Sequence, residues 1–233
     1  MITQPIHAIV FDFDGTLVDS MSLWHQIDIT YLGRRGLQCP DDLSFEVSGK
    51  SFTETAEYFK KRFNLSDSVD MIKAEWDLMS RDSILTKIDF KPGALPFLSW
   101  IHEKGIPMSI ATSNTRSVLE LFLPKYGIEH LFHSLHFTCE VGKGKPHPDV
   151  FLDAAKALNV PPENCLVFED TLEGINGALS AGMPVISVDD SHQYQRLELI
   201  QRSTLCHIKN YQELMTDHFS QYLFRRSYDV NTF

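Results

Sequence analysis

The sequence has few cysteines and none of them are paired in motifs. Cys39, Cys139, Cys165 and Cys206 lie far apart among the 233 residues, and no CxxC motif is present. Structural zinc sites and dithiol redox centres use closely spaced cysteines. We therefore expect reduced thiols and a function that does not depend on cysteine chemistry.

Long apolar runs and an excess of positive charge are also missing. No run reaches the ~18 apolar residues of a membrane span, and MITQPIHAIVFDFDG at the amino terminus lacks the basic segment that opens a signal peptide. Lysine and arginine total 21 against 31 aspartate and glutamate, which gives a formal net charge of −10. This balance disfavours nucleic-acid and membrane partners, because nothing would attract their phosphates. We expect a cytoplasmic protein.

What is present is a series of short apolar runs, which are typical of strands buried in a parallel sheet. They lie at 6–11, 107–112, 134–138, 165–168 and 184–188. Helical patterns at 117–126, 149–158 and 171–181 separate the later runs. Such alternation predicts an α/β fold with a Rossmann-like parallel sheet.

About 95 residues separate the first strand from the second, too many for one crossover. Most of this stretch has helical periodicity, and Ser51-Phe52-Thr53-Glu54 has the spacing of a capping box that opens a helix. We predict an α/β core at 1–17 and 90–233 with an all-helical cap domain at 18–89.

The predicted strands end in polar residues. The first ends in Asp12-Phe13-Asp14-Gly15-Thr16, the second in Ser113-Asn114 and the fourth in Glu169-Asp170, while Lys145 lies in the loop after the third. The carboxyl ends of parallel strands share one edge, where open α/β folds bind ligands. Three aspartates there form a hard oxygen cluster suited to Mg²⁺. Lys145 and free N–H groups at the start of the helix after Asn114 would attract phosphate.

Four segments in this order resemble the motifs of the haloacid dehalogenase superfamily: DFDGT, Thr-Ser-Asn at the second strand end, GKGKPHPD and VFEDTLEGINGALSAGM. The helical stretch after the first segment resembles the small helical cap of the phosphatase and phosphomutase branch. This resemblance implies that Asp12 is the nucleophile that accepts the phosphoryl group. It also implies that Asp14 protonates the leaving oxygen and later deprotonates water.

The resemblance extends to the binding residues. Phosphate would be bound by Gly15, Thr16, Ser113, Asn114 and Lys145. Mg²⁺ would be held by Asp12, the Asp14 carbonyl and Asp170, with Glu169 as a direct ligand or one position further out.

The cap carries a weaker signal. The segment Gly49-Lys50-Ser51 resembles the cap loop that meets the substrate, so Gly49 and Lys50 are candidate substrate contacts, but Lys50 also fits an exposed lysine at the start of a helix. Trp24 and His25 on the first cap helix could face the crevice, but we interpret Trp24 as cap core.

Together these features predict a Mg²⁺-dependent phosphatase. It would hydrolyse a small phosphorylated metabolite, a sugar or polyol phosphate monoester, through an aspartyl-phosphate, as a monomer or weak dimer. A sugar phosphomutase of the β-phosphoglucomutase type shares the core motifs and is one alternative, but Phe52 stands where that enzyme's cap loop has an arginine. A non-catalytic regulator that binds a phosphorylated ligand is the other, although no catalytic residue is missing. A dehalogenase or a phosphonate hydrolase would lack Asp14.

Overall fold

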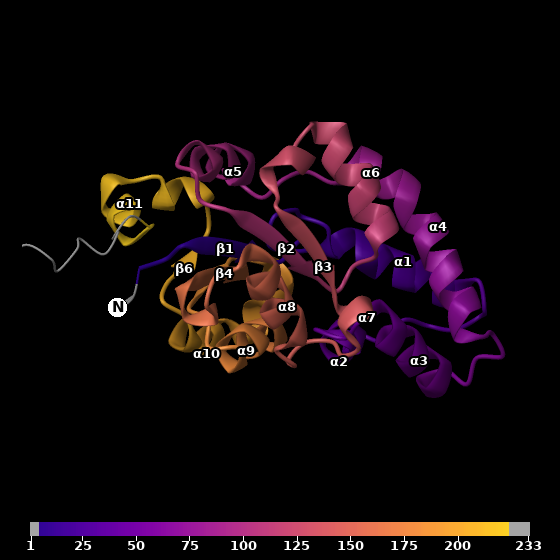
Figure 1. The fold of residues 1–233 in the computed structure, drawn as a ribbon. Coiled ribbons are helices and arrows are strands. Elements are labelled where there is room, and N and C mark those ends of the chain that lie inside the picture. Colours follow the sequence, from indigo (N-terminus) through magenta and orange to yellow (C-terminus); the bar gives the residue numbers. More distant parts are fainter. Residues whose placement is uncertain (1–4, 224–233) are drawn as a thin grey trace, which may run out of the picture.

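The computed structural model describes residues 5–223, and its centre is a six-stranded parallel sheet (Figure 1). The strand order is β3-β2-β1-β4-β5-β6. The strands are β1 (Ala8–Phe11), β2 (Met108–Thr112), β3 (Ser134–Phe137), β4 (Cys165–Glu169), β5 (Val185–Val188) and β6 (His207–Ile208). The chain builds outward from β1 on one side and then restarts at β4 on the other, which makes the β1–β4 junction the switch point of the sheet. The predicted parallel α/β fold is confirmed.

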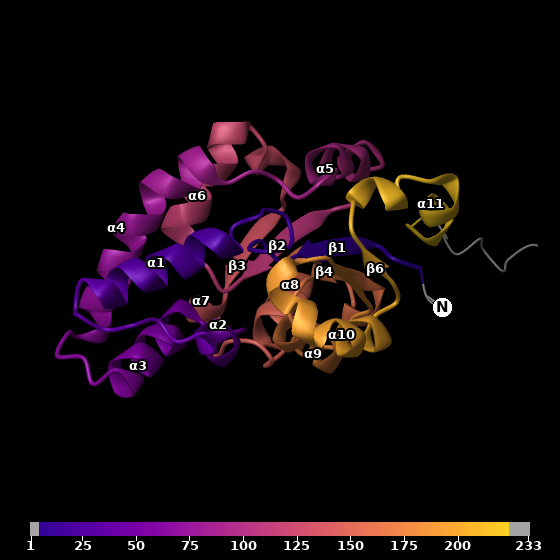
Figure 2. The same cartoon turned by 180° about the vertical axis from the view of Figure 1, so that it is seen from behind.

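Helices cover both faces of the sheet (Figures 1 and 2). Because successive side chains of a strand alternate in direction, Ile9 and Phe11 of β1 join one hydrophobic cluster, and Ala8 and Val10 join the other. Helices α5, α6 and α11 pack on the first face and α8, α9 and α10 on the second. Burial on both faces explains why the strands appear in the sequence as continuous apolar runs.

The helices of this part have the following bounds. They are α5 (Ala94–Glu103), α6 (Arg116–Tyr126), α7 (Thr138–Val141), α8 (Asp149–Leu158), α9 (Leu172–Ser180), α10 (Leu197–Ser203) and α11 (Asp217–Leu223), with short 3₁₀ helices η1 (Glu129–Leu131), η2 (Pro162–Asn164), η3 (Ser191–Arg196) and η4 (Tyr211–Leu214). Within residues 5–223, no helix combines the length and apolarity needed to span a bilayer.

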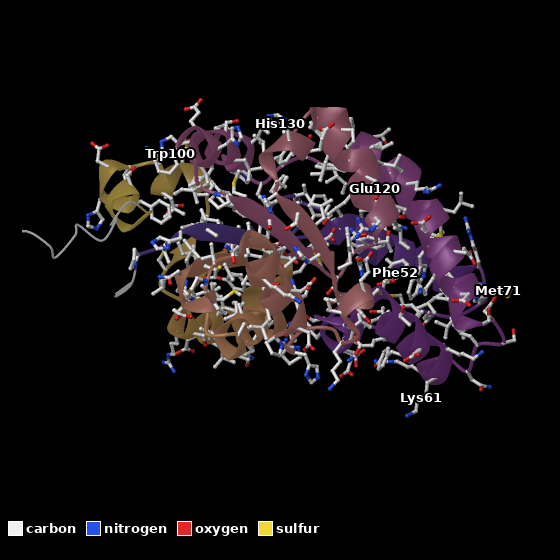
Figure 3. The ribbon with its side chains drawn as sticks, viewed as in Figure 1. Phe52, Lys61, Met71, Trp100, Glu120 and His130 are labelled. Atoms are coloured by element: carbon white, nitrogen blue, oxygen red, sulfur yellow. The ribbon has the colours of Figure 1, made fainter. Side chains whose placement is uncertain are left out.

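Four helices lie between β1 and α5 and share a hydrophobic cluster of their own. They are α1 (Met21–Gly33), α2 (Leu43–Val47), α3 (Phe52–Arg62) and α4 (Val69–Lys87). Trp76 is central to this cluster, with its ring centroid 4.7 Å from that of Phe59 and 5.5 Å from that of Phe52. Figure 3 shows Phe52 directed inward, whereas Lys61 on the same helix points outward. We call these four helices the helical insert; its role as a cap and its boundaries at 18 and 89 stay predictions.

The insert is joined to the sheet domain at several places. Val18 forms an isolated antiparallel bridge with Phe90, where the chain leaves and re-enters the sheet domain. Helix α4 lies beside α6, as both views show (Figures 1 and 2). The capping box predicted at Ser51 is present, since the Ser51 hydroxyl accepts from Glu54 N at 3.2 Å and the Glu54 carboxylate accepts from Ser51 N at 2.8 Å. The start of α3 is therefore fixed by local sequence.

Candidate active site

The carboxyl ends of β1, β2 and β4 meet the helical insert around one pocket of about 180 Å³. The predicted site residues that line it are Asp12, Asp14, Gly49, Lys50, Ser113, Asn114, Lys145 and Glu169. Gly15, Thr16 and Asp170 do not line this pocket. Thr16 and Asp170 are buried next to it and joined to each other, with Thr16 Oγ1 donating to Asp170 Oδ1 at 2.9 Å. Phosphate binding by Gly15 and Thr16 stays a prediction.

Lys145 occupies the centre of the site. Its Nζ donates to Asp12 Oδ1 and to Glu169 Oε1, both at 2.5 Å, and its side chain is 2% exposed. Burial by itself would lower the pKa of Lys145, but the charges of Asp12 and Glu169 outweigh it and raise the pKa above its usual range. The ammonium therefore stays charged at neutral pH and offsets the repulsion between two carboxylates.

Asp12 itself is destabilised as an anion. Burial raises the pKa of Asp12 to about 7, Lys145 opposes this shift, and the charges of Glu169 and Asp14 add to it. The carboxylate thus lies in a place where negative charge accumulates and where one further cation would lower its pKa.

Asp14 is held by three hydrogen-bond donors. Its Oδ1 accepts from Ser20 Oγ at 2.6 Å and from Trp24 Nε1 at 2.8 Å, and its Oδ2 accepts from Asn114 Nδ2 at 2.8 Å. Burial raises the pKa of Asp14, although these three hydrogen bonds act in the opposite direction. The carboxyl group is therefore fixed in direction and prone to hold a proton.

The hydrogen bonds of two of these donors to Asp14 were not predicted from the sequence. The interpretation of Trp24 as cap core is incomplete, because its ring packs against Phe52 at 6.1 Å between centroids while its indole N–H reaches Asp14. Ser20 directly precedes α1, a position where serine is common, so the sequence gives no sign of this contact. The Asn114 side chain, predicted to bind phosphate, here orients Asp14.

The acidic cluster fits a divalent cation. Asp12, Glu169 and Asp170 each offer an oxygen, and these atoms lie within 4.8 Å of one another. Asp170 Oδ2 is buried and has no hydrogen-bond partner within the described residues, and burial raises the pKa of Asp170. An unpartnered buried carboxylate oxygen is costly unless a cation satisfies it. Because all three donors are carboxylates, the set suits a hard ion such as Mg²⁺.

The backbone at Gly15 adds to this fit. Gly15 has φ +77°, and a Cβ placed there would lie 2.4 Å from Asp170 Oδ2. Only glycine allows both the left-handed conformation and this close approach. The Glu169 carboxylate is also fixed, because its Oε2 accepts from Thr171 N at 2.8 Å and from Thr171 Oγ1 at 3.0 Å.

The loop between α2 and α3 lies against the sheet domain. Gly49 has φ +74°, and a Cβ there would lie 2.5 Å from Glu173 Cβ and 2.7 Å from the Lys145 carbonyl oxygen. Ser48 Oγ donates to Glu173 Oε2 at 2.7 Å, and Ser113 Oγ donates to the Gly49 carbonyl at 3.4 Å. The insert therefore closes one side of the pocket in this conformation.

Lys50 lines the pocket and is only partly exposed. Its Nζ lies 5.7 Å from the centre of the Tyr58 ring. A role of Lys50 in substrate binding stays a prediction.

A parallel sheet covered on both faces, with a buried centre of carboxylates and lysine at its carboxyl edge, defines this chain as an α/β enzyme. Residues 9–188 match the family model described as haloacid dehalogenase-like hydrolase. The chain belongs to this family, which confirms the resemblance of its motifs.

Relatives with named activities match most of the length of this chain. (DL)-glycerol-3-phosphatase 1, mitochondrial, of Arabidopsis thaliana is 33% identical over 198 residues, which cover 80% of this chain and 65% of that protein's length. The probable pseudouridine-5′-phosphatase of Drosophila melanogaster is 32% identical over 197 residues, which cover 81% of this chain and 84% of that protein. The crystal structure of β-phosphoglucomutase from Clostridium difficile superposes with a TM-score of 0.79 at 21% identity, covering 94% and 97% of the two chains, and shows the shared fold.

Proposed function

We propose that this protein is a divalent-cation-dependent phosphatase that hydrolyses a small phosphate monoester through an aspartyl-phosphate on Asp12. The observation that carries the proposal is the contact of Lys145 with both Asp12 and Glu169 beside the unpartnered oxygen of Asp170. This arrangement keeps a nucleophilic carboxylate, a fixed ammonium and a set of cation ligands together in one pocket. The two relatives named as phosphatases support it.

Asp12 and Lys145 would carry out the first displacement. Lys145 directs Asp12 through its hydrogen bond and can neutralise a phosphoryl oxygen. A divalent cation such as Mg²⁺, held by Asp12, Glu169 and Asp170, would neutralise the charge that a phosphate dianion meets among these carboxylates. An Asp12 oxygen then bonds to phosphorus, the bond from phosphorus to the ester oxygen breaks, and the alcohol departs.

Asp14 would supply and recover the proton. A carboxyl group can accept about four hydrogen bonds, and three on Asp14 are taken by Ser20, Trp24 and Asn114. The remaining position on Oδ2 can hold the proton that the raised pKa favours. Asp14 gives this proton to the departing ester oxygen and then takes one from the water that attacks phosphorus, which frees phosphate and restores Asp12.

The pocket favours hydrolysis over phosphoryl return to a sugar. A mutase has to hold a second phosphate, for which a bidentate arginine is best suited, yet no described residue that lines the pocket is an arginine. Phe52 stands at the start of α3 and packs between Trp24 and Trp76, with centroid distances of 6.1 and 5.5 Å. Lys50 adds only a point charge.

The size of the pocket indicates a compact substrate. Its volume of about 180 Å³ is below the roughly 300–1,000 Å³ of pockets that take drug-sized ligands. A sugar or polyol phosphate is therefore the proposed substrate class, in line with the glycerol-3-phosphatase named above. The helical insert would select among such esters and contribute little to bond breaking.

Phosphate release from p-nitrophenyl phosphate and glycerol 3-phosphate, with Mg²⁺ and with EDTA, tests the proposal. We expect turnover with Mg²⁺, none in EDTA and none in Asp12→Asn. Conversion of β-glucose 1-phosphate to glucose 6-phosphate with little free phosphate would favour a mutase. Binding of phosphate esters without any turnover would favour a regulator.

A further inference from the structure

Several polar side chains line the pocket and take no part in the chemistry described above. Two of them come from different parts of the chain, one from the helical insert and one from the segment after β5. They are Asp28 on α1 and Gln193 on η3. Asp28 lies four residues after Trp24, so the two share one face of α1 and are about 6 Å apart along its axis. The Trp24 N–H reaches Asp14, and Asp28 lines the same pocket one helical turn further along α1.

Gln193 is a buried residue whose side-chain oxygen is unpartnered among the described residues. It is 6% exposed, and its Oε1 has no partner within the described residues, although its backbone N–H donates to Asp190 O at 3.0 Å. A buried carboxamide oxygen that accepts no hydrogen bond is rare in native proteins and requires an explanation. A bound molecule that supplies the partners provides one.

Asp28 is in a similar position on the insert side. Its carboxyl group is partly buried, and no hydrogen bond or ion pair joins it to the other described side chains. Burial raises the pKa of Asp28 to about 7. A ligand that donates hydrogen bonds to this group would stabilise its ionised form.

We propose that Asp28 and Gln193 form the subsite for the alcohol part of the substrate and select a polyhydroxy alcohol whose hydroxyl groups lie away from the phosphate. The inference rests on the proposed phosphatase function and adds the residues that recognise the alcohol part of the ester. A hydroxyl both donates and accepts, which matches a carboxylate and a carboxamide that line the same pocket. An alkyl analogue without hydroxyls would leave both groups unpaired and should be strongly disfavoured.

The surrounding rings argue against a cationic leaving group. An aromatic cage for an ammonium ion offers ring faces to the ligand. Here Phe52 and Trp76 are 8% and 3% exposed and meet edge to face, with an interplanar angle of 70°. Both rings are buried within the insert, and an ammonium group would also leave the carboxamide N–H groups of Gln193 unused.

Matched pairs of esters test the subsite. Glycerol 3-phosphate is compared with propyl phosphate, and sorbitol 6-phosphate with hexyl phosphate, with p-nitrophenyl phosphate as the generic ester. For the better pair we expect the wild type to prefer the polyol ester by roughly 100-fold or more in kcat/KM. Asp28→Leu, Asp28→Asn and Gln193→Met should each reduce this preference at least about tenfold through a higher KM for the polyol ester.

Thermal denaturation separates recognition from a structural role. Gln193→Met removes an unpartnered polar group, so its Tm should equal or exceed that of the wild type while its KM for the polyol ester rises. Glu57→Gln, on the exposed side of α3, is the matched control and should change neither quantity. A lower Tm with unchanged selectivity would show that Gln193 is structural.

The outcomes for the two proposals differ. Retention of the wild-type polyol preference in all three variants would overturn the subsite and leave the phosphatase proposal intact. A preference for ethanolamine phosphate that is lost in Asp28→Leu would assign the carboxylate to a cation and overturn the polyol assignment. Failure of the wild type to hydrolyse any of these esters with Mg²⁺ would overturn both proposals.

Discussion

Replacing Lys145 by methionine should destabilise the protein strongly and in a pH-dependent way. The ammonium lies 2.5 Å from Asp12 Oδ1 and 2.5 Å from Glu169 Oε1. At an effective dielectric constant of about 20, each pair corresponds to roughly 7 kcal/mol of Coulomb attraction, much of which the desolvation of the ammonium offsets. Lys145→Met removes the cation and leaves two buried carboxylates facing each other.

The expected loss of stability in Lys145→Met follows from comparable buried ion pairs. Removal of one partner costs about 3–5 kcal/mol, which for a chain of this length lowers Tm by roughly 6–20 °C. This loss should apply at pH 8 in EDTA. At pH 5 the loss should be smaller, because the pKa of Asp12, raised to about 7 by burial with Lys145 still present, rises further without the ammonium and the carboxyl is then neutral.

Urea and thermal denaturation at the two pH values measure this effect. Lys143→Met is the matched control, since Lys143 is exposed and lies in the same loop. A Lys145→Met variant as stable as the control at pH 8 would refute the claim that Lys145 holds the acidic centre together.

Three further predictions concern the acidic centre around Lys145 and the loop between α2 and α3. Burial raises the pKa of Asp12 to about 7 and the pKa values of Asp14 and Asp170 above their usual range, so the folded protein binds more protons than the unfolded chain. In EDTA the free energy of unfolding should therefore fall from pH 5 to pH 8. A rise would contradict these shifts. Asp170→Asn should raise the Mg²⁺ concentration for half-maximal activity about 10-fold or more, and an unchanged requirement would place the cation elsewhere. Lys50→Ala should raise KM for the natural ester far more than for p-nitrophenyl phosphate; equal effects on both would place Lys50 outside the substrate contacts.

The sheet could be predicted from the sequence because most of its strand residues are buried on both faces. Strands β1 to β5 therefore appear as apolar runs bounded by turns. Strand β6 has two residues, His207 and Ile208, and helix α2 has five, so neither is long enough to show a periodicity. Their existence depends on packing against elements already in place.

The site residues could be predicted from the sequence only where they lie at or near the ends of strands. Asp12, Lys145 and Glu169 come together because parallel strands align their carboxyl ends, and this rule applies without knowledge of the insert. The Trp24 contact with Asp14 depends on how α1 packs, which no short-range pattern specifies. The unpartnered state of Gln193 likewise appears only once the whole pocket is assembled.

The central claim is that Asp12 carries the phosphoryl group. Rapid acid quench of the enzyme during turnover of its best ester, followed by peptide mapping by mass spectrometry, tests it most directly. We expect an acid-stable, alkali-labile phosphoryl group on the peptide that contains Asp12, absent from Asp12→Asn and in samples quenched without Mg²⁺. A phosphoryl group on another residue, or sustained turnover by Asp12→Asn with deamidation excluded, would contradict the account.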